Sequence, residues 1–197
     1  MSAAVNLGED PASLTGYAYC RDLSELDETG WSRSRLGLAP SQEKRVRQRC
    51  GPSGGQAVSG SFKTPHAENR SVSVRGSHRV GKHVWVVIMK AVGTGVAGVS
   101  ATGYCRNEKV REMTETKVAS GGDIDRAVAR CKRGQRVISG GFQTENFASE
   151  GGPFVYASRK QGRRGWIVRV RSTAPETFTS YAYCWKKRAR DPQPAGV

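Results

Sequence analysis

Hydrophobic and polar residues alternate with a period of two along much of this chain, which is the pattern of β-strands. In the sequence WIVRVR at 166–171, the tryptophan and the two valines would face a core, while Arg169 and Arg171 would face solvent. The segment 84–89 is apolar throughout, as expected for a central strand. No long segment has the spacing of an amphipathic helix. The pattern therefore predicts an all-β fold.

The strand pattern occurs twice, with a period of about 80 residues. Each copy contains a cysteine, a Ser-Gly-x-Phe strand, a tryptophan and a Tyr-Cys pair, in that order. These landmarks are Cys50, Ser59–Phe62, Trp85 and Tyr104–Cys105 in the first copy, and Cys131, Ser139–Phe142, Trp166 and Tyr183–Cys184 in the second. The glycines of the strands at 56–62 and 135–142 predict a bulge or a close approach of the backbone. We therefore expect two tandem antiparallel units, packed as sandwiches or in a prism-like array.

The sequence before the first copy repeats the end of the second. Tyr17–Cys20 and Tyr181–Cys184 are both Tyr-Ala-Tyr-Cys. Alternation would put the two tyrosines of each segment on one face of a strand and the cysteine on the other. We expect an N-terminal strand from a partial third unit, and favour a chain that is a piece of a longer precursor. The alternative is that this strand completes a unit whose own last strand pairs elsewhere.

These landmarks divide the chain into five parts. They are a leader, partial repeat strand and linker at 1–49, β repeat unit 1 at 50–105, an inter-repeat linker at 106–130, β repeat unit 2 at 131–187, and a disordered tail at 188–197. In the two irregular intervals, we expect 41–49 and 123–130 to begin with a short helical turn and then extend into the cysteine that follows.

The five cysteines lie at the boundaries of the repeats, without a Cys-x-x-Cys pair, and this placement favours disulfides over metal binding or catalysis, with buried free thiols as the alternative. Two pairing schemes are open. Pairing within units gives Cys50–Cys105 and Cys131–Cys184 and leaves Cys20 over. Pairing between units gives Cys20–Cys50 and Cys105–Cys131 and leaves Cys184 over. We favour pairing within units, because it makes each unit self-sufficient.

Disulfides predict an extracellular or cell-envelope location. The first 20 residues lack the pattern of a secretory signal, which is equally compatible with a cytosolic chain and with a mature exported one. No apolar run is long enough to span a bilayer.

The formal net charge of +15 is concentrated in the repeats, because residues 1–30 hold one base and six acids. Such a field attracts polyanions and makes their binding sensitive to salt. The bases cluster at 44–49, 75–83, 159–164 and 186–190. We predict that a cationic face of the second unit and the tail bind acidic polymers through Arg159, Lys160, Arg163, Arg164, Arg169, Arg171, Lys186, Lys187, Arg188 and Arg190.

Two other interpretations stay open. Tyr181, Tyr183 and Trp185 adjoin the bases of the tail, and aromatic rings beside bases can bind single-stranded nucleic acid. Aromatic residues in strands are, however, more often part of a core. The alternative is a structural or adhesion repeat, whose charge serves solubility and whose aromatic faces bind another protein.

The motifs also resemble a known type of repeat. Cys-x-x-Gly, Ser-Gly-Gly-Phe, Gly-Trp-x-Val and Tyr-Ala-Tyr-Cys are similar to a cysteine-bounded β repeat of poorly characterised secreted proteins of actinobacteria. The matching residues are Cys131, Gly134, Ser139–Phe142, Gly165–Trp166, Val168 and Tyr181–Cys184. The first copy departs from the motif, since residues are inserted after Cys50 and Ser61 replaces a glycine. The resemblance implies a disulfide-bonded β module without catalytic residues. The layout is also similar to that of β-prism proteins.

Nothing in the sequence favours catalysis or a cofactor. The three histidines, His66, His78 and His83, all lie in the first copy, and no residue is singled out as a nucleophile. His78 and His83, beside bases, suit contact with an anion better than a metal. We therefore predict a non-enzymatic, exported module that binds acidic polysaccharide or another polyanion, with a protein partner or nucleic acid as alternatives.

Overall fold

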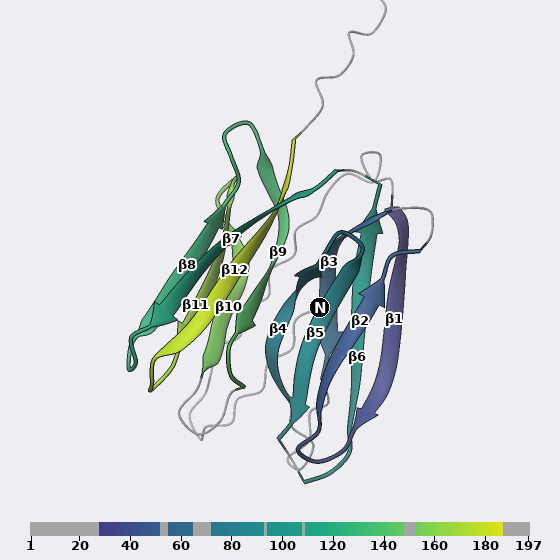
Figure 1. Cartoon of the computed structure of the whole chain (residues 1–197), viewed down its shortest axis with the longest axis vertical. Helices are drawn as coiled ribbons and strands as arrows, with labels where there is room; N and C mark the ends of the chain where they lie inside the picture. The colour runs from purple at the N-terminus through teal and green to yellow at the C-terminus, as the bar shows by residue number, and fades with distance from the viewer. Residues whose placement is uncertain are drawn as a thin grey trace, which may run out of the picture.

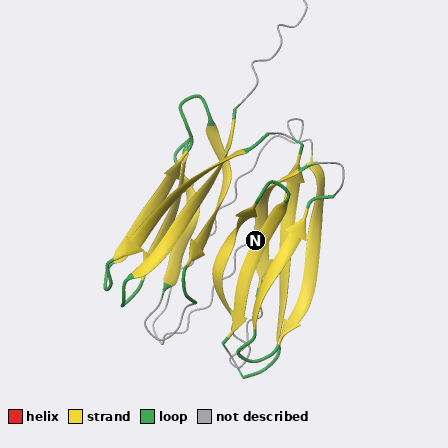
Figure 2. Cartoon of the chain, in the orientation of Figure 1, coloured by secondary structure: helices red, strands yellow, loops and turns green. Residues whose placement is uncertain are grey.

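The computed structural model describes residues 28–51, 55–64, 72–92, 94–107, 109–147 and 153–186. These residues form strands, turns and loops and no helix, so the predicted all-β fold is confirmed (Figures 1 and 2). The described strands are β1 (Glu28–Leu38), β2 (Glu43–Arg49), β3 (Gln56–Lys63), β4 (Val72–Val80), β5 (Val84–Ala91), β6 (Ala97–Arg106), β7 (Arg111–Ala119), β8 (Ile124–Arg130), β9 (Arg136–Thr144), β10 (Phe154–Gln161), β11 (Gly165–Arg171) and β12 (Glu176–Trp185).

The strands form two units that lie side by side (Figure 1). In the first unit, the sheet β1-β6-β3 packs against β2-β5-β4. In the second unit, the sheet β7-β12-β9 packs against β8-β11-β10. Antiparallel pairing of β4 with β9 joins β2-β5-β4 and β9-β12-β7 into one six-stranded sheet. The two units therefore share a sheet.

The two units have the same connectivity and the same contacts at the end where each disulfide lies. The amide of Cys50 donates to the carbonyl of His83 at 2.8 Å, and the amide of Cys131 donates to that of Arg164 at 2.8 Å. Each unit contains six strands, which are β1–β6 and β7–β12. The interval 106–130, which we expected to be a linker, contains β7 and β8, and the interval 1–49 contributes β1 and β2.

The expectation of short helical turns at 41–49 and 123–130 is wrong. The extended parts of these intervals are present as β2 and β8, and each strand ends directly before its cysteine. Alternating burial explains β8, because Ala127 and Ala129 face the core between exposed or half-buried neighbours. A turn precedes it instead of a helix, since Gly121 has a φ of 92° that favours glycine.

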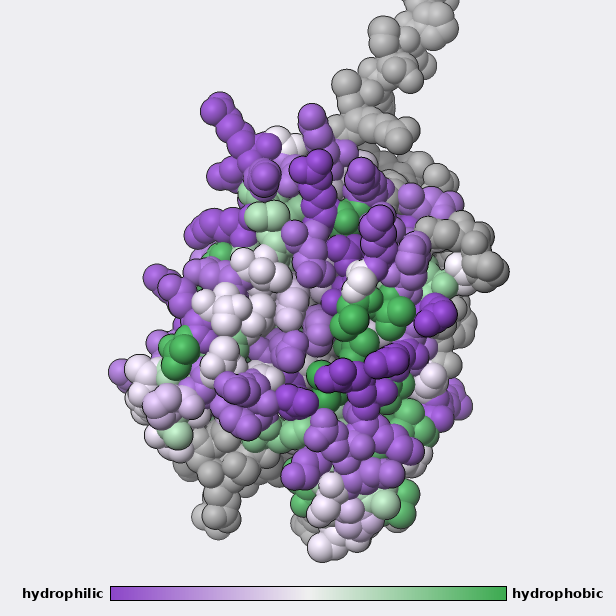
Figure 3. All heavy atoms as spheres, in the orientation of Figure 1, coloured by the Kyte–Doolittle hydropathy of each residue, from purple (hydrophilic) through white to green (hydrophobic). Residues whose placement is uncertain are grey.

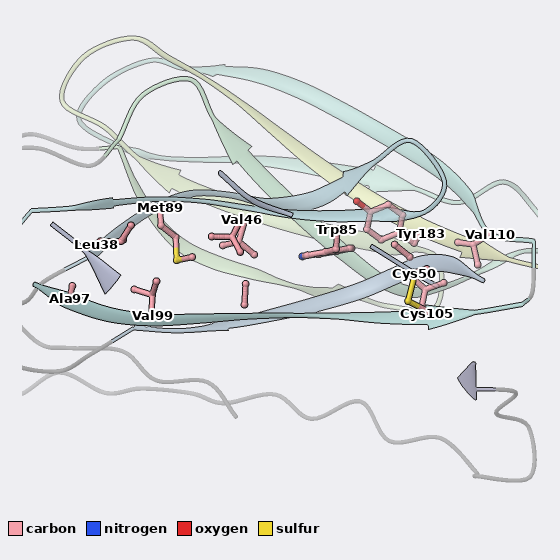
Figure 4. Packing of buried hydrophobic residues seen from close by; sticks show 14 of the residues in the cluster. Leu38, Val46, Cys50, Trp85, Met89, Ala97, Val99, Cys105, Val110 and Tyr183 are labelled. Carbon is pink, nitrogen blue, oxygen red and sulfur yellow. A yellow bond between two sulfur atoms is a disulfide. The ribbon is translucent and has the colours of Figure 1, made fainter. Parts of the chain in front are cut away.

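A tryptophan lies at the centre of each core (Figure 4 shows the first). Its indole N–H donates to a serine hydroxyl, from Trp85 to Ser77 at 3.1 Å and from Trp166 to Ser158 at 2.9 Å. The ring lies against a glycine of the Ser-Gly strand, because a Cβ at Gly60 would be 2.1 Å from Trp85 Nε1. The close approach of the backbone that the glycines predicted is confirmed.

The disulfides are Cys50–Cys105 and Cys131–Cys184, with Cα–Cα distances of 5.7 and 5.5 Å. Pairing within units is therefore confirmed. Each disulfide closes a loop of more than 50 residues, which stabilises the fold by about 4 kcal/mol in the chain-entropy description. Cys20 and the N-terminal strand that we predicted lie outside the described residues.

Tyr183 links the second unit to the core of the first. The ring of this fully buried side chain meets Trp85 edge to face, with centroids 5.4 Å apart. The amide of Arg79 donates to its hydroxyl at 2.7 Å, and the Arg79 guanidinium lies 4.9 Å from its ring. The backbones also approach closely, because a Cβ at Gly141 would lie 2.2 Å from the carbonyl oxygen of Ser77. Strand β12 is thus packed on both faces.

Candidate polyanion-binding surface

The structure distributes the predicted basic residues over four places in the second unit. Arg163 and Arg164 lie in the turn between β10 and β11, and Lys186 follows β12. Arg159, Arg169 and Arg171 belong to the outer face of the sheet β8-β11-β10. Alternation places Arg169 and Arg171 on the face of β11 that lies away from the buried Trp166, Val168 and Val170. Arg159 shares this outer face, because its register partner on β11 is Ile167. Lys160 lies on the other face of β10, where it pairs with Trp166. Lys187, Arg188 and Arg190 lie outside the described residues.

The end of the second unit that carries its disulfide brings basic residues together from six places in the chain. The backbone holds them there. The amide of Val137, near the start of β9, donates to the carbonyl of Arg163 at 3.0 Å. Register pairs join the end of β12 to the starts of β7 and β9 and join β8 to β11. We call this surface the basic end, and it comprises Arg111, Arg130, Lys132, Arg133, Arg136, Arg163, Arg164 and Lys186.

A tight turn exposes two of these residues. The amide of Gln135 donates to the carbonyl of Lys132 at 3.1 Å, and Gly134 adopts a φ of 81° that favours glycine. Lys132 and Arg133 precede this glycine, and both are exposed. Hydrophilic side chains project from this end of the second unit, at the upper left of Figure 3.

The charges of the basic end are not neutralised by the described chain. None of its eight residues forms a salt bridge or a side-chain hydrogen bond with a described residue, and all except the half-buried Arg136 are exposed. Glu112, beside Tyr183 in register, is instead paired with Arg79 at 3.5 Å. Burial raises the pKa of Glu112, although Arg79 opposes this. An uncompensated positive field is therefore available to a ligand.

A second group of arginines continues from the basic end along the outer face of β8-β11-β10. Arg126 and Arg169 are direct cross-strand partners. Like charges in this position are destabilising by up to about 1 kcal/mol, so a bound anion would relieve the pair. Arg171 follows Arg169 by two residues on the same face of β11, so their backbone positions lie about 6.6 Å apart. We call Arg126, Arg159, Arg169 and Arg171 the arginine face.

Sequence reasoning missed more than half of the basic end, namely Arg111, Arg130, Lys132, Arg133 and Arg136, and it also missed Arg126. Several belong to β7 and β8, which were expected to form a linker. The signal was present in the sequence Arg126-Ala127-Val128-Ala129-Arg130, where small inward residues alternate with the outward positions. Alanine carries little hydrophobic signal, so this strand was not recognised.

Two arginines of the predicted basic cluster at 75–83 in the first unit are different in character. Arg75 is paired with Glu43 at 3.4 Å, and its guanidinium lies 5.0 Å from the ring of Phe147. Arg79 is buried at the junction of the units, where it pairs with Glu112. These two arginines therefore hold the structure together and are not offered to a ligand.

The expectation that His78 contacts an anion is wrong. Its ring is buried and stacks on Tyr181, with centroids 4.8 Å apart. Burial, and secondly the charge of Arg45, lower the pKa of His78 from 6.5 to about 4, although a hydrogen bond to the Phe142 backbone opposes this. His78 is therefore neutral at pH 7. His83 contacts the carbonyl oxygen of Gly55 through Nδ1 at 2.9 Å.

Within the described segments, no group of three or more His, Cys, Asp and Glu side chains is placed to hold a metal ion. The same segments contain no helix long and apolar enough to cross a membrane. Comparison of the chain with protein-family models, with curated protein sequences and with solved structures gave no match.

Proposed function

We propose that this chain is a non-enzymatic module that binds polyanions, with acidic polysaccharide as its principal ligand. The observation that carries this proposal is the basic end, where eight cations from six places in the chain meet without a carboxylate partner among the described residues. The arginine face extends the same field along β11. Like charges held together by the fold destabilise it, and a bound polyanion would offset that cost.

The two disulfides support an oxidising location, at the cell envelope or outside the cell. Acidic polysaccharides are polymers of that compartment, whereas nucleic acid belongs mainly to the inside of the cell. The motif that resembles repeats of secreted actinobacterial proteins supports the same location. The tyrosines that suggested nucleic-acid binding are not free to stack on bases, because Tyr183 is fully buried and Tyr181 stacks on His78.

The geometry favours recognition by charge over recognition of one precise shape. Most cations of the basic end stand on turns and strand ends, and their side chains are exposed. Binding of this kind releases counterions, so the affinity should fall steeply as salt rises.

Fluorescently labelled dextran sulfate, with neutral dextran as the negative control, tests this function. Each bound sulfate that releases a counterion steepens the slope of log K against log salt, by roughly 0.7 to 0.9 per contact for nucleic acids. Five contacts would therefore weaken binding by a factor on the order of 100 between 50 and 200 mM salt.

A matched pair of variants separates the surface from the net charge. Arg163→Glu with Arg164→Glu reverses two charges at the basic end, whereas Arg35→Glu with Lys63→Glu makes the same change elsewhere. Arg35 and Lys63 both pair with Ser100, five residues before Cys105, at about 17 Å from the disulfide end of β6. We expect the first variant to lose at least about tenfold in affinity and the second to lose much less.

Equal losses in the two variants would show that only net charge matters and would overturn the assigned surface. Absence of dextran sulfate binding at 50 mM salt would overturn the function. A ligand interaction that persists unchanged at 200 mM salt would instead support the alternative of a protein-binding repeat.

A further inference from the structure

Exposed apolar side chains lie among the arginines of the arginine face. Ile124, Phe154 and Tyr156 are 52%, 47% and 56% exposed. Arg171 pairs with Ile124 of β8 on one side and with Phe154 of β10 on the other, so the three form one row across the sheet. Tyr156 is the extra residue of a bulge in β10, next to Ala157, the register partner of Arg169. Two exposed aromatic rings thus stand beside two arginines.

The first unit shows that the fold does not require these aromatic residues. Its corresponding row is Glu43, Lys90 and Ser73, which is polar throughout. Its corresponding bulge holds Arg75, which pairs with Glu43. The same place in the second unit carries rings that the described chain leaves exposed, and such a patch on a cationic surface indicates a binding site.

A sugar ring fits this combination of groups. One face of a pyranose presents C–H groups that can lie flat on an aromatic ring, while a carboxylate or sulfate at its edge can accept paired hydrogen bonds from a guanidinium. Tyrosine also offers a hydroxyl to the sugar hydroxyls. The bases of a single strand could stack in the same way, but the two disulfides favour a compartment where acidic polysaccharide is the available polymer.

We propose that Phe154 and Tyr156, with Arg169 and Arg171, form a subsite for the sugar rings of an acidic polysaccharide, whose chain continues toward the basic end. This inference rests on the proposed function and adds the class of ligand to it. The subsite makes the protein distinguish an acidic sugar polymer from a polyanion that has no rings.

Two probes of similar charge test it, namely oligogalacturonate, which has sugar rings, and polyphosphate, which has none. The variant Phe154→Ser with Tyr156→Ala removes the aromatic rings without changing the charge. Stacking in other systems predicts a loss of about fivefold to tenfold or more in affinity for oligogalacturonate, with polyphosphate binding unchanged. Both side chains are exposed, and the near-ultraviolet circular dichroism and the melting temperature of the variant show whether it has folded.

The outcomes separate the inference from the function on which it rests. If polyphosphate binds and the variant binds oligogalacturonate as well as the unchanged protein does, the subsite is refuted while the function stands. Equal losses for both probes would also refute the subsite, and failure of both probes to bind the unchanged protein would refute the function. Oligodeoxythymidylate is the third probe, and ring-dependent binding of this probe without binding of oligogalacturonate would replace the sugar with a nucleic acid.

Discussion

Replacement of Tyr183 by phenylalanine removes one oxygen atom from the junction between the two units. The hydroxyl of Tyr183 accepts the amide hydrogen of Arg79 at 2.7 Å, in a place where both residues are buried. The ring would keep its contacts with Trp85 and with the Arg79 guanidinium. The variant therefore isolates the hydrogen bond.

The expected loss follows from the amide that is left behind. A buried N–H without a partner costs about 1–3 kcal/mol, and the more apolar phenylalanine ring offsets part of this. We expect the free energy of unfolding to fall by about 1–2 kcal/mol. For a chain of this size, each kcal/mol lowers the melting temperature by about 2–4 °C.

Tyr104 provides the matched control, because it holds the corresponding place in the first unit and is 39% exposed. Its replacement by phenylalanine should change the stability by less than about 0.5 kcal/mol. Urea unfolding with intact disulfides, followed by tryptophan fluorescence, measures both variants. Similar losses in the two variants, or no loss in Tyr183→Phe, would refute the description of Tyr183 as a buried link between the units.

Three further changes follow from the same structure. Gly141→Ser should lower the free energy of unfolding by about 1–3 kcal/mol, because a Cβ at this position would lie 2.2 Å from the Ser77 carbonyl oxygen. The reciprocal change at the corresponding position of the first unit, Ser61→Gly, should lower it by about 1 kcal/mol or less, and urea unfolding measures both variants. Joint replacement of Cys131 and Cys184 by alanine should lower the stability by about 4 kcal/mol in the same assay, and an unchanged midpoint would contradict the disulfide. The unfolded chain takes up a proton at His78 near pH 6.5, and the folded chain only near pH 4, so this group's contribution to stability is lost as the pH falls between these values. Between pH 7 and pH 4 the unchanged protein should therefore lose about 3 kcal/mol more than His78→Phe, and parallel stability curves would show that His78 titrates normally.

The sequence was sufficient for the fold class, for the faces of β11 and for the presence of disulfides, because each of these depends on local alternation or on cysteine placement, but it left two disulfide pairing schemes open. It was not sufficient for β7, where Ala119 alone is fully buried and the other side chains are half-buried or exposed. An edge strand with two wetted faces carries no hydrophobic period. The joining of β4 to β9 was also out of reach, since it depends on a backbone pairing between residues far apart in the chain.

The candidate surface was only partly predictable for a related reason. Arg163 and Arg164 are neighbours in sequence and form a visible basic cluster, whereas Arg111, Arg130 and Arg136 are isolated positions that the strand pairing brings together. A basic cluster in the sequence therefore identifies bases that share one turn. To recognise the whole surface, one must also know the register of the sheets, which brings the isolated bases together.

The junction also covers, in the first unit, positions whose counterparts in the second unit border the proposed ligand surface. Three residues of β4 in the first unit, Ser77, His78 and Arg79, are buried at the junction, whereas their counterparts Ser158, Arg159 and Lys160 on β10 are half-exposed. The same contact between two copies of the chain would be weaker than the junction, because Ser61 stands where the junction has Gly141, and its Cβ would approach a backbone oxygen. This difference disfavours another copy as the occupant of the free side of the second unit and leaves that side to a different ligand.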